Sequence, residues 1–133
     1  MHYKWLKKYG TGVQSVDEQH RHFFELASEA YEQSLAPTIN PQEIRDTLDR
    51  LNTYVFYHFS IEEKYMETAK QSARKLHMDA HTAYRIRMRI YRDQARKAGV
   101  DMAVLAREIT DFSTNWLGQH IQAMDKETVK PQH

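Results

Sequence analysis

The sequence contains no cysteine among its 133 residues, which excludes disulfides, thiolate zinc sites, iron–sulfur clusters and cysteine nucleophiles together. Glycine and proline are scarce, at 4 and 3 residues, and no segment shows the alternating pattern of a half-buried strand. No run of about 18 apolar residues occurs, and the basic N-terminus lacks the apolar stretch of a signal peptide. We therefore expect a largely helical, soluble and cytoplasmic protein with no membrane partner.

The formal net charge is +1, so the overall charge balance calls for neither nucleic acid nor an anionic surface as a partner. A length of 133 residues suits one domain with one sizeable core. We see no internal repeat, low-complexity tract or linker that would divide the chain. The expectation is a single domain over residues 1–133.

Apolar residues recur with helical spacing in four segments, at about residues 17–35, 41–68, 72–97 and 101–120. Short connections between helices of similar length favour antiparallel neighbours. The predicted fold class is therefore all-α, an up-down-up-down antiparallel four-helix bundle. The flanking parts are expected to be an N-terminal arm packed on the outside and a C-terminal turn and tail, over residues 1–16 and 121–133.

Capping residues support these helix boundaries. Asp17 is expected to be the N-cap of the first helix and Asp101 that of the fourth. Asn40 precedes Pro41, which suits the first helical position, and Glu43 stands three residues after the cap. The second helix thus has the best defined start of the four.

Five histidines fall on the apolar faces of these helices: His20, His58, His77, His81 and His120. His58 and Glu62 are four residues apart, as are His77 and His81, so the members of each pair share one helix face. Asp125 follows His120 by five residues, which suits a helix that runs out into a turn.

Buried imidazoles and carboxylates are unfavourable unless they are hydrogen-bonded, paired or coordinated to a metal. A single histidine on an apolar face is usually a core or boundary residue, but here seven donors share the inward faces of a bundle. Seven exceeds the four ligands of a tetrahedral site, so the count indicates two metals. Imidazole with carboxylate suits iron, manganese, zinc or copper, and the excess of histidine favours reversible binding over hydrolysis or oxygen activation.

Four short motifs resemble those of the hemerythrin family, in its single-domain bacterial form. They are VDEQH at residues 16–20, HFSIEE at 58–63, HMDAH at 77–81 and WLGQHI at 116–121, followed by Asp125. The resemblance covers nearly the whole chain and includes Trp5 and Gly12 in the arm. It departs between Met66 and His77, where the family often has a Tyr-Pro turn and this chain does not.

The resemblance implies a cofactor of two iron ions, in the Fe2+ or Fe3+ state, joined by an oxo or hydroxo bridge. By similarity, His77, His81 and His120 would bind one iron, His20 and His58 would bind the other, and Glu62 and Asp125 would bridge the pair. The iron with two histidines keeps one open position, where dioxygen would bind. The family positions that line an apolar O2 pocket correspond here to Phe23, Phe59, Trp116, Leu117 and Ile121.

The resemblance therefore implies a non-enzymatic protein that binds dioxygen reversibly, for oxygen storage, transport and delivery, or sensing. Two alternatives share the same ligands. One is a di-iron redox enzyme acting on peroxide or nitric oxide, and the other is a protein that stores or donates iron.

Arg85, Arg89, Arg92 and Arg96 form a basic stripe along the third predicted helix. We interpret it as a solvated face with intrahelical ion pairs, with an unidentified protein partner or weak self-association as the alternative. No aromatic residues alternate with these arginines, so a nucleic-acid partner is not expected.

Overall fold

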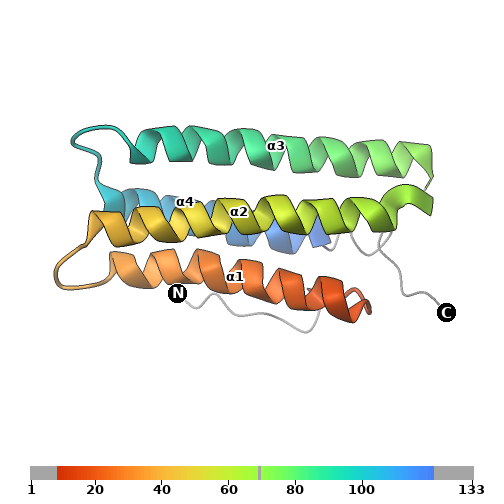
Figure 1. The fold of residues 1–133 in the computed structure, drawn as a ribbon, viewed down its shortest axis with the longest axis horizontal. Helices are drawn as coiled ribbons and strands as arrows, with labels where there is room; N and C mark the ends of the chain where they lie inside the picture. Colours follow the sequence, from red (N-terminus) through yellow and green to blue (C-terminus); the bar gives the residue numbers. More distant parts are fainter. Residues whose placement is uncertain (1–8, 69, 122–133) are drawn as a thin grey trace.

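The computed structural model describes residues 9–68 and 70–121 and forms a bundle of long helices (Figure 1). The elements in order are α1 (Gln14–Ser34), α2 (Pro41–Tyr65), the 3-10 turn η2 (Met66–Thr68), α3 (Gln71–Ala95) and α4 (Met102–His120). Successive helices run in opposite directions along the bundle. The predicted all-α, up-down-up-down fold is confirmed.

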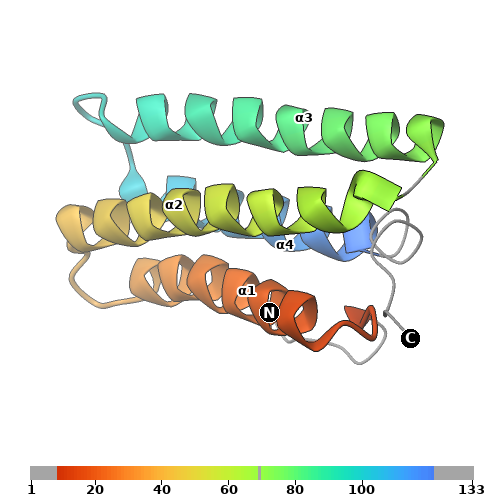
Figure 2. The same cartoon turned by 45° about the vertical axis from the view of Figure 1, so that its right-hand side comes forward.

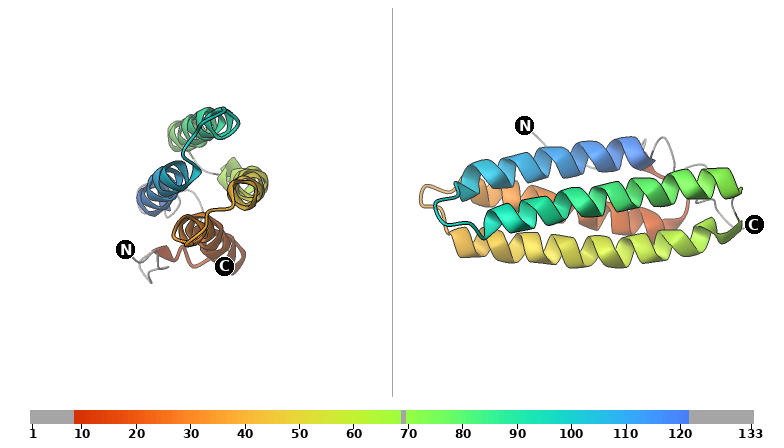
Figure 3. Two further views of the ribbon diagram at one scale, coloured as in Figure 1. Left: turned by 90° about the vertical axis from the view of Figure 1, so that its left-hand side faces the viewer. Right: turned by 90° about the horizontal axis from the view of Figure 1, so that it is seen from above.

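The end-on view in Figure 3 places the helices at the corners of a four-sided bundle, with α1 diagonal to α3 and α2 diagonal to α4. Each of α1 and α3 packs against both α2 and α4. The largest side chains of the core come from all four helices and include Phe23, Ile44, Leu51, Tyr84 and Ile109. In Figure 2 the α2–α3 connection lies at one end of the bundle, opposite the other two connections.

The predicted starts of α2 and α4 are confirmed. The Asn40 side chain accepts hydrogen bonds from the backbone N–H groups of Gln42 and Glu43, at 3.1 and 3.2 Å, and Pro41 is the first helical residue. The Asp101 carboxylate accepts from the N–H of Val104 at 3.1 Å. Each cap satisfies backbone donors that the first helical turn leaves without an intrahelical acceptor.

The predicted start of α1 is wrong. The helix begins at Gln14, three residues before Asp17, and Val13 is its N-cap. The Asp17 carboxylate instead accepts hydrogen bonds from the backbone N–H and the hydroxyl of Thr11, both at 2.7 Å, and from the N–H of Gly12 at 3.3 Å. Asp17 therefore stabilises the turn before the helix and does not cap the helix. Gly12 in this turn has a φ of 86°, a conformation that glycine adopts readily.

The antiparallel order explains why distant histidines meet. His20 lies near the start of α1, His58 in the last third of α2, His77 near the start of α3 and His120 at the end of α4. Because successive helices alternate in direction, these positions all fall at the end of the bundle that carries the α2–α3 connection.

The expected arm is described from residue 9 onward, and Trp5 lies outside the described residues. The Tyr9 ring packs against Phe24 of α1, with ring centroids 5.7 Å apart. A Cβ added at Gly118 would lie 3.2 Å from the Tyr9 ring, so glycine permits the close approach of Tyr9 to α4. Across the described part of the chain, no helix combines the length and the apolarity needed to cross a membrane.

Candidate metal centre

The Glu62 carboxylate lies at the centre of the five histidines. All five turn Nε2 toward it, and the Glu62 side chain is fully buried. His20 Nε2 lies 3.2 Å from Oε2, and His58 and His81 Nε2 lie 3.3 and 3.1 Å from Oε1. The four helices thus bring one carboxylate and five imidazoles into a single buried cluster.

The cluster has two halves that share Glu62. One half contains Glu62, His77, His81 and His120, and the other contains His20, His58 and Glu62; within each half, one ligand atom per residue lies within 4.8 Å of the others. His77 and His120 Nε2 lie 3.8 and 3.9 Å from Glu62 Oε1. The three-and-two division of the histidines follows from the geometry of the helices.

The spacing of the donor atoms suits metal coordination. With metal–nitrogen bonds of about 2.1 Å, ligands at right angles lie about 3.0 Å apart. His81 Nε2 lies 3.1 Å from Glu62 Oε1 and 3.2 Å from His120 Nε2. One imidazole nitrogen carries at most one hydrogen and cannot donate to both neighbours, whereas a shared cation would satisfy all three atoms. The donor set therefore fits a metal.

Two opposing effects act on the pKa of Glu62. Burial raises it, but the nearby imidazoles of His58, His20 and His77 lower it, and the net pKa lies well below the usual range. The carboxylate is therefore ionised at neutral pH. Ionisation is the form required of a carboxylate that binds a metal.

Burial also lowers the pKa of His81 to about 4, and the nearby Glu62 carboxylate opposes this effect without cancelling it. The imidazole is thus neutral at physiological pH. A neutral imidazole is the form that binds a metal, so the environment of His81 prepares it for this role.

The outer nitrogens of two histidines face polar side chains that the sequence reasoning had not assigned to the site. Gln19 Oε1 lies 3.0 Å from His58 Nδ1, so a hydrogen on Nδ1 donates to the amide and leaves the Nε2 lone pair facing the cluster. Glu63 Oε2 lies 4.0 Å from His81 Nδ1. In the sequence, Gln19 is next to His20 and Glu63 is next to Glu62. This adjacency was the only feature of the sequence that could have pointed to them.

Glu63 follows Glu62 on α2, so its side chain leaves the helix in a different direction. It lies at the outer edge of His81, beside Arg85. Its side chain is only 24 % exposed. Glu63 therefore belongs to the surroundings of the cluster.

The five residues expected to line an O2 pocket all lie in the core around the histidines, four of them fully buried and Trp116 half-buried. Phe59 stacks on His81 with centroids 3.8 Å apart, and Trp116 stacks on His120 at 4.3 Å. Phe23 meets His58 edge-on at 6.3 Å. The aromatic rings thus shield both halves of the cluster from water. That these five residues contact O2 stays a prediction.

Asp125, the second expected bridging carboxylate, lies outside the described residues. The structure therefore brings together six of the seven expected ligands, His20, His58, Glu62, His77, His81 and His120.

A four-helix bundle with a buried cluster of histidines around one carboxylate defines a class of helical metal-binding proteins. Within this class, the chain belongs to the hemerythrin HHE cation-binding domain family, whose model matches residues 11–130.

Several known bacterial proteins are similar along most of the chain. A bacteriohemerythrin of Clostridium acetobutylicum is 24% identical over 127 residues, covering 94% of this chain and 97% of the relative. One from Methylococcus capsulatus is 29% identical over 119 residues, covering 90% and 87%. One from Pseudomonas aeruginosa is 27% identical over 124 residues, covering 93% and 77%. The comparison with solved structures gave no significant match.

Proposed function

We propose that this chain is a non-haem di-iron protein that binds dioxygen reversibly and serves oxygen storage, delivery or sensing. The observation that carries the proposal is the sharing of Glu62 between a half with three histidines and a half with two. A site with unequal halves gives one metal a smaller set of protein ligands. Membership of the hemerythrin family supports the choice of iron.

In this proposal His77, His81 and His120 hold one iron, and His20 and His58 hold the other. Glu62 and Asp125 would be carboxylate ligands shared by both irons. When bound, the iron pair would supply the two electrons that binding of dioxygen requires, and we expect dioxygen to bind on the side of His20 and His58, where the protein offers fewer ligands. The protein acts as a binding protein and not as an enzyme, and a cytoplasmic location remains part of the proposal.

The chain's own residues contribute two further effects. Phe23 and Phe59 lie against His58, at centroid distances of 6.3 and 5.9 Å, and keep water away from this half of the cluster. Excluding water and protons favours reversible binding over irreversible oxidation. Gln19 holds His58 in the tautomer that presents Nε2 to the cluster.

The test is anaerobic loading of the purified protein with ferrous iron, followed by repeated cycles of air and argon. The proposal predicts two irons per chain and a visible absorption spectrum that appears in air and disappears under argon. The matched control is His22→Ala, because His22 lies on the same helix as His20 but its side chain is 50% exposed and faces Glu25. This variant should load and cycle like the wild type.

Conversion to an oxidised form on first exposure to air, without recovery under argon, would refute reversible binding. Sustained consumption of peroxide or nitric oxide with a reductant would instead indicate the redox enzyme. Rapid loss of both irons to a chelator would indicate storage or donation.

A further inference from the structure

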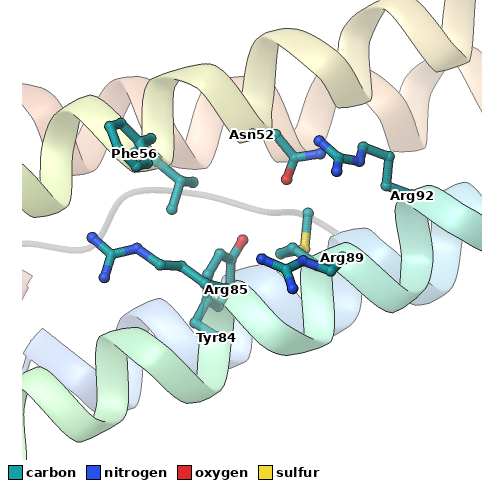
Figure 4. Close-up of a pocket in the computed structure, with 8 residues that line it drawn as sticks. Asn52, Phe56, Tyr84, Arg85, Arg89 and Arg92 are labelled. Carbon is teal, nitrogen blue, oxygen red and sulfur yellow. The ribbon is translucent and has the colours of Figure 1, made fainter.

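A second candidate site lies outside the metal cluster, in a groove between α2 and α3 (Figure 4). The groove encloses a volume of about 210 Å³. Its apolar lining comes from Val55 on α2 and from Tyr84 and Met88 on α3, all of them buried, and the exposed Phe56 ring forms part of its rim. The groove thus has a buried apolar floor beneath an exposed aromatic rim.

Three arginines line the α3 side of this groove. Arg85, Arg89 and Arg92 follow one another at spacings of four and three residues, so they share one face of the helix. In Figure 4 Arg85 reaches toward Phe56 and Arg92 toward Asn52, both on α2, with Arg89 between them. Among the described residues that line the groove, none is acidic. The lining therefore combines an apolar floor with three guanidinium groups, of which Arg85 is paired with Glu63 outside the lining.

Some cations elsewhere on the surface are neutralised by ion pairs. Lys75 pairs with Asp79 along α3 at 2.9 Å, and Arg50 pairs with Glu29 across α1 and α2 at 2.9 Å. Arg89 and Arg92, by contrast, form no ion pair within residues 9–68 and 70–121. The expectation that intrahelical pairs neutralise the whole basic stripe is therefore not met at these two positions.

We propose that the groove binds a small organic carboxylate with an apolar body. The carboxylate would lie between Arg89 and Arg92, because guanidinium groups bind carboxylates through paired N–H donors. The apolar body would cover Val55, Met88 and the Phe56 ring. The volume is smaller than the roughly 300 Å³ of typical drug-sized sites, so the ligand is about the size of a single aromatic ring with its carboxylate.

Arg85 links this groove to the histidine cluster by two contacts. Its guanidinium lies 3.5 Å from Glu63 Oε2, and the same oxygen lies 4.0 Å from His81 Nδ1. The guanidinium also lies 5.1 Å above the Phe59 ring, which stacks on His81. A carboxylate that draws Arg85 toward the groove would weaken its contact with Glu63 and change the charge beside His81. This coupling deepens the proposed function, whereas binding in the groove does not depend on iron.

The binding test uses benzoate as the probe and isothermal titration calorimetry on the full-length, metal-free protein. We expect saturable binding of one benzoate per chain, weakened at least tenfold in the double variant Arg89→Gln/Arg92→Gln. The matched control is Arg74→Gln/Lys75→Gln, which removes the same charge from the first turns of α3, outside the groove. Benzoate should bind this control like the wild type.

Absence of saturable binding to the wild type, or equal weakening in both double variants, would overturn the proposal. Inorganic phosphate binding as tightly as benzoate would overturn the role of the apolar floor. A hexaglutamate peptide binding more tightly than benzoate would show that the groove takes an acidic protein segment instead of a small ligand.

The coupling is measured separately by the ¹⁵N NMR signals of the His81 ring in the metal-free protein. Benzoate is expected to shift these signals in the wild type, and the shift should disappear in Glu63→Gln, which retains Arg89 and Arg92. Unchanged signals at saturating benzoate would overturn the coupling. Because the protein sample contains no iron, a negative result would overturn the coupling without bearing on the di-iron proposal.

Discussion

The contact between Gln19 and His58 leads to a prediction about one half of the cluster. Gln19 Oε1 lies 3.0 Å from His58 Nδ1. Replacing such an outer partner of a metal-binding histidine typically reduces metal affinity by about 10–100-fold. This loss of affinity corresponds to about 1.4–2.7 kcal/mol of binding free energy. Gln19→Ala should therefore lower the affinity for the iron bound by His20 and His58, and leave the affinity for the iron of the other half nearly unchanged.

The assay is an anaerobic titration with ferrous iron against a competing chelator, which resolves the affinities of the two irons. Gln14→Ala is the matched control, because Gln14 lies on the same helix but its side chain bonds to Glu18 on the exposed surface. Wild-type affinity for both irons in Gln19→Ala would refute a role for Gln19 in iron binding. An equal loss of affinity for both irons would also refute this role, because the substitution would then have disturbed the whole bundle.

Three further predictions test the cluster and its support. His20→Ala should reduce the iron content from two to one per chain and abolish oxygenation, whereas His77→Ala should impair retention of the other iron; normal loading and spectra in both variants would show the assignment to be wrong. Thr110→Val removes the hydrogen bond that the buried hydroxyl donates to the Ala27 carbonyl at 2.6 Å, and should lower the free energy of unfolding by about 1 kcal/mol in urea denaturation. An unchanged urea midpoint would contradict this estimate. The pKa of His81 is lowered from 6.5 to about 4 by burial, so the unfolded chain binds a proton before the folded one does as the pH falls. The metal-free protein should therefore lose about 2 kcal/mol of stability between pH 7 and pH 4.5 from this residue, and His81→Phe should lose correspondingly less over the same range.

The sequence was sufficient to predict the bundle and the convergence of the cluster. Helical spacing and the caps at Asn40 and Asp101 define where α2 and α4 begin. Because the helices are antiparallel, histidines far apart in the sequence had to meet at one end. The i, i+4 spacing of His58 and Glu62 then placed both on one inward face.

Other features depend on contacts that periodicity does not encode. Asp17 is as suitable a cap as Asn40 by residue type, but its carboxylate bonds to Thr11 and Gly12 in the preceding turn. The contact of Gln19 with His58 depends on how α1 and α2 face each other, at a separation of 39 residues. Likewise, the groove lined by Arg89 depends on how α2 and α3 pack, so the basic stripe alone could not reveal a cavity.

The proposed centre is a pair of irons held by unequal halves that share Glu62. Mössbauer spectroscopy of the protein loaded anaerobically with ⁵⁷Fe, together with iron analysis, tests it most directly. We expect two irons per chain and two ferrous signals of equal area from inequivalent sites, with both signals altered in Glu62→Gln. A single iron per chain, or a Glu62→Gln spectrum identical to the wild type, would contradict it.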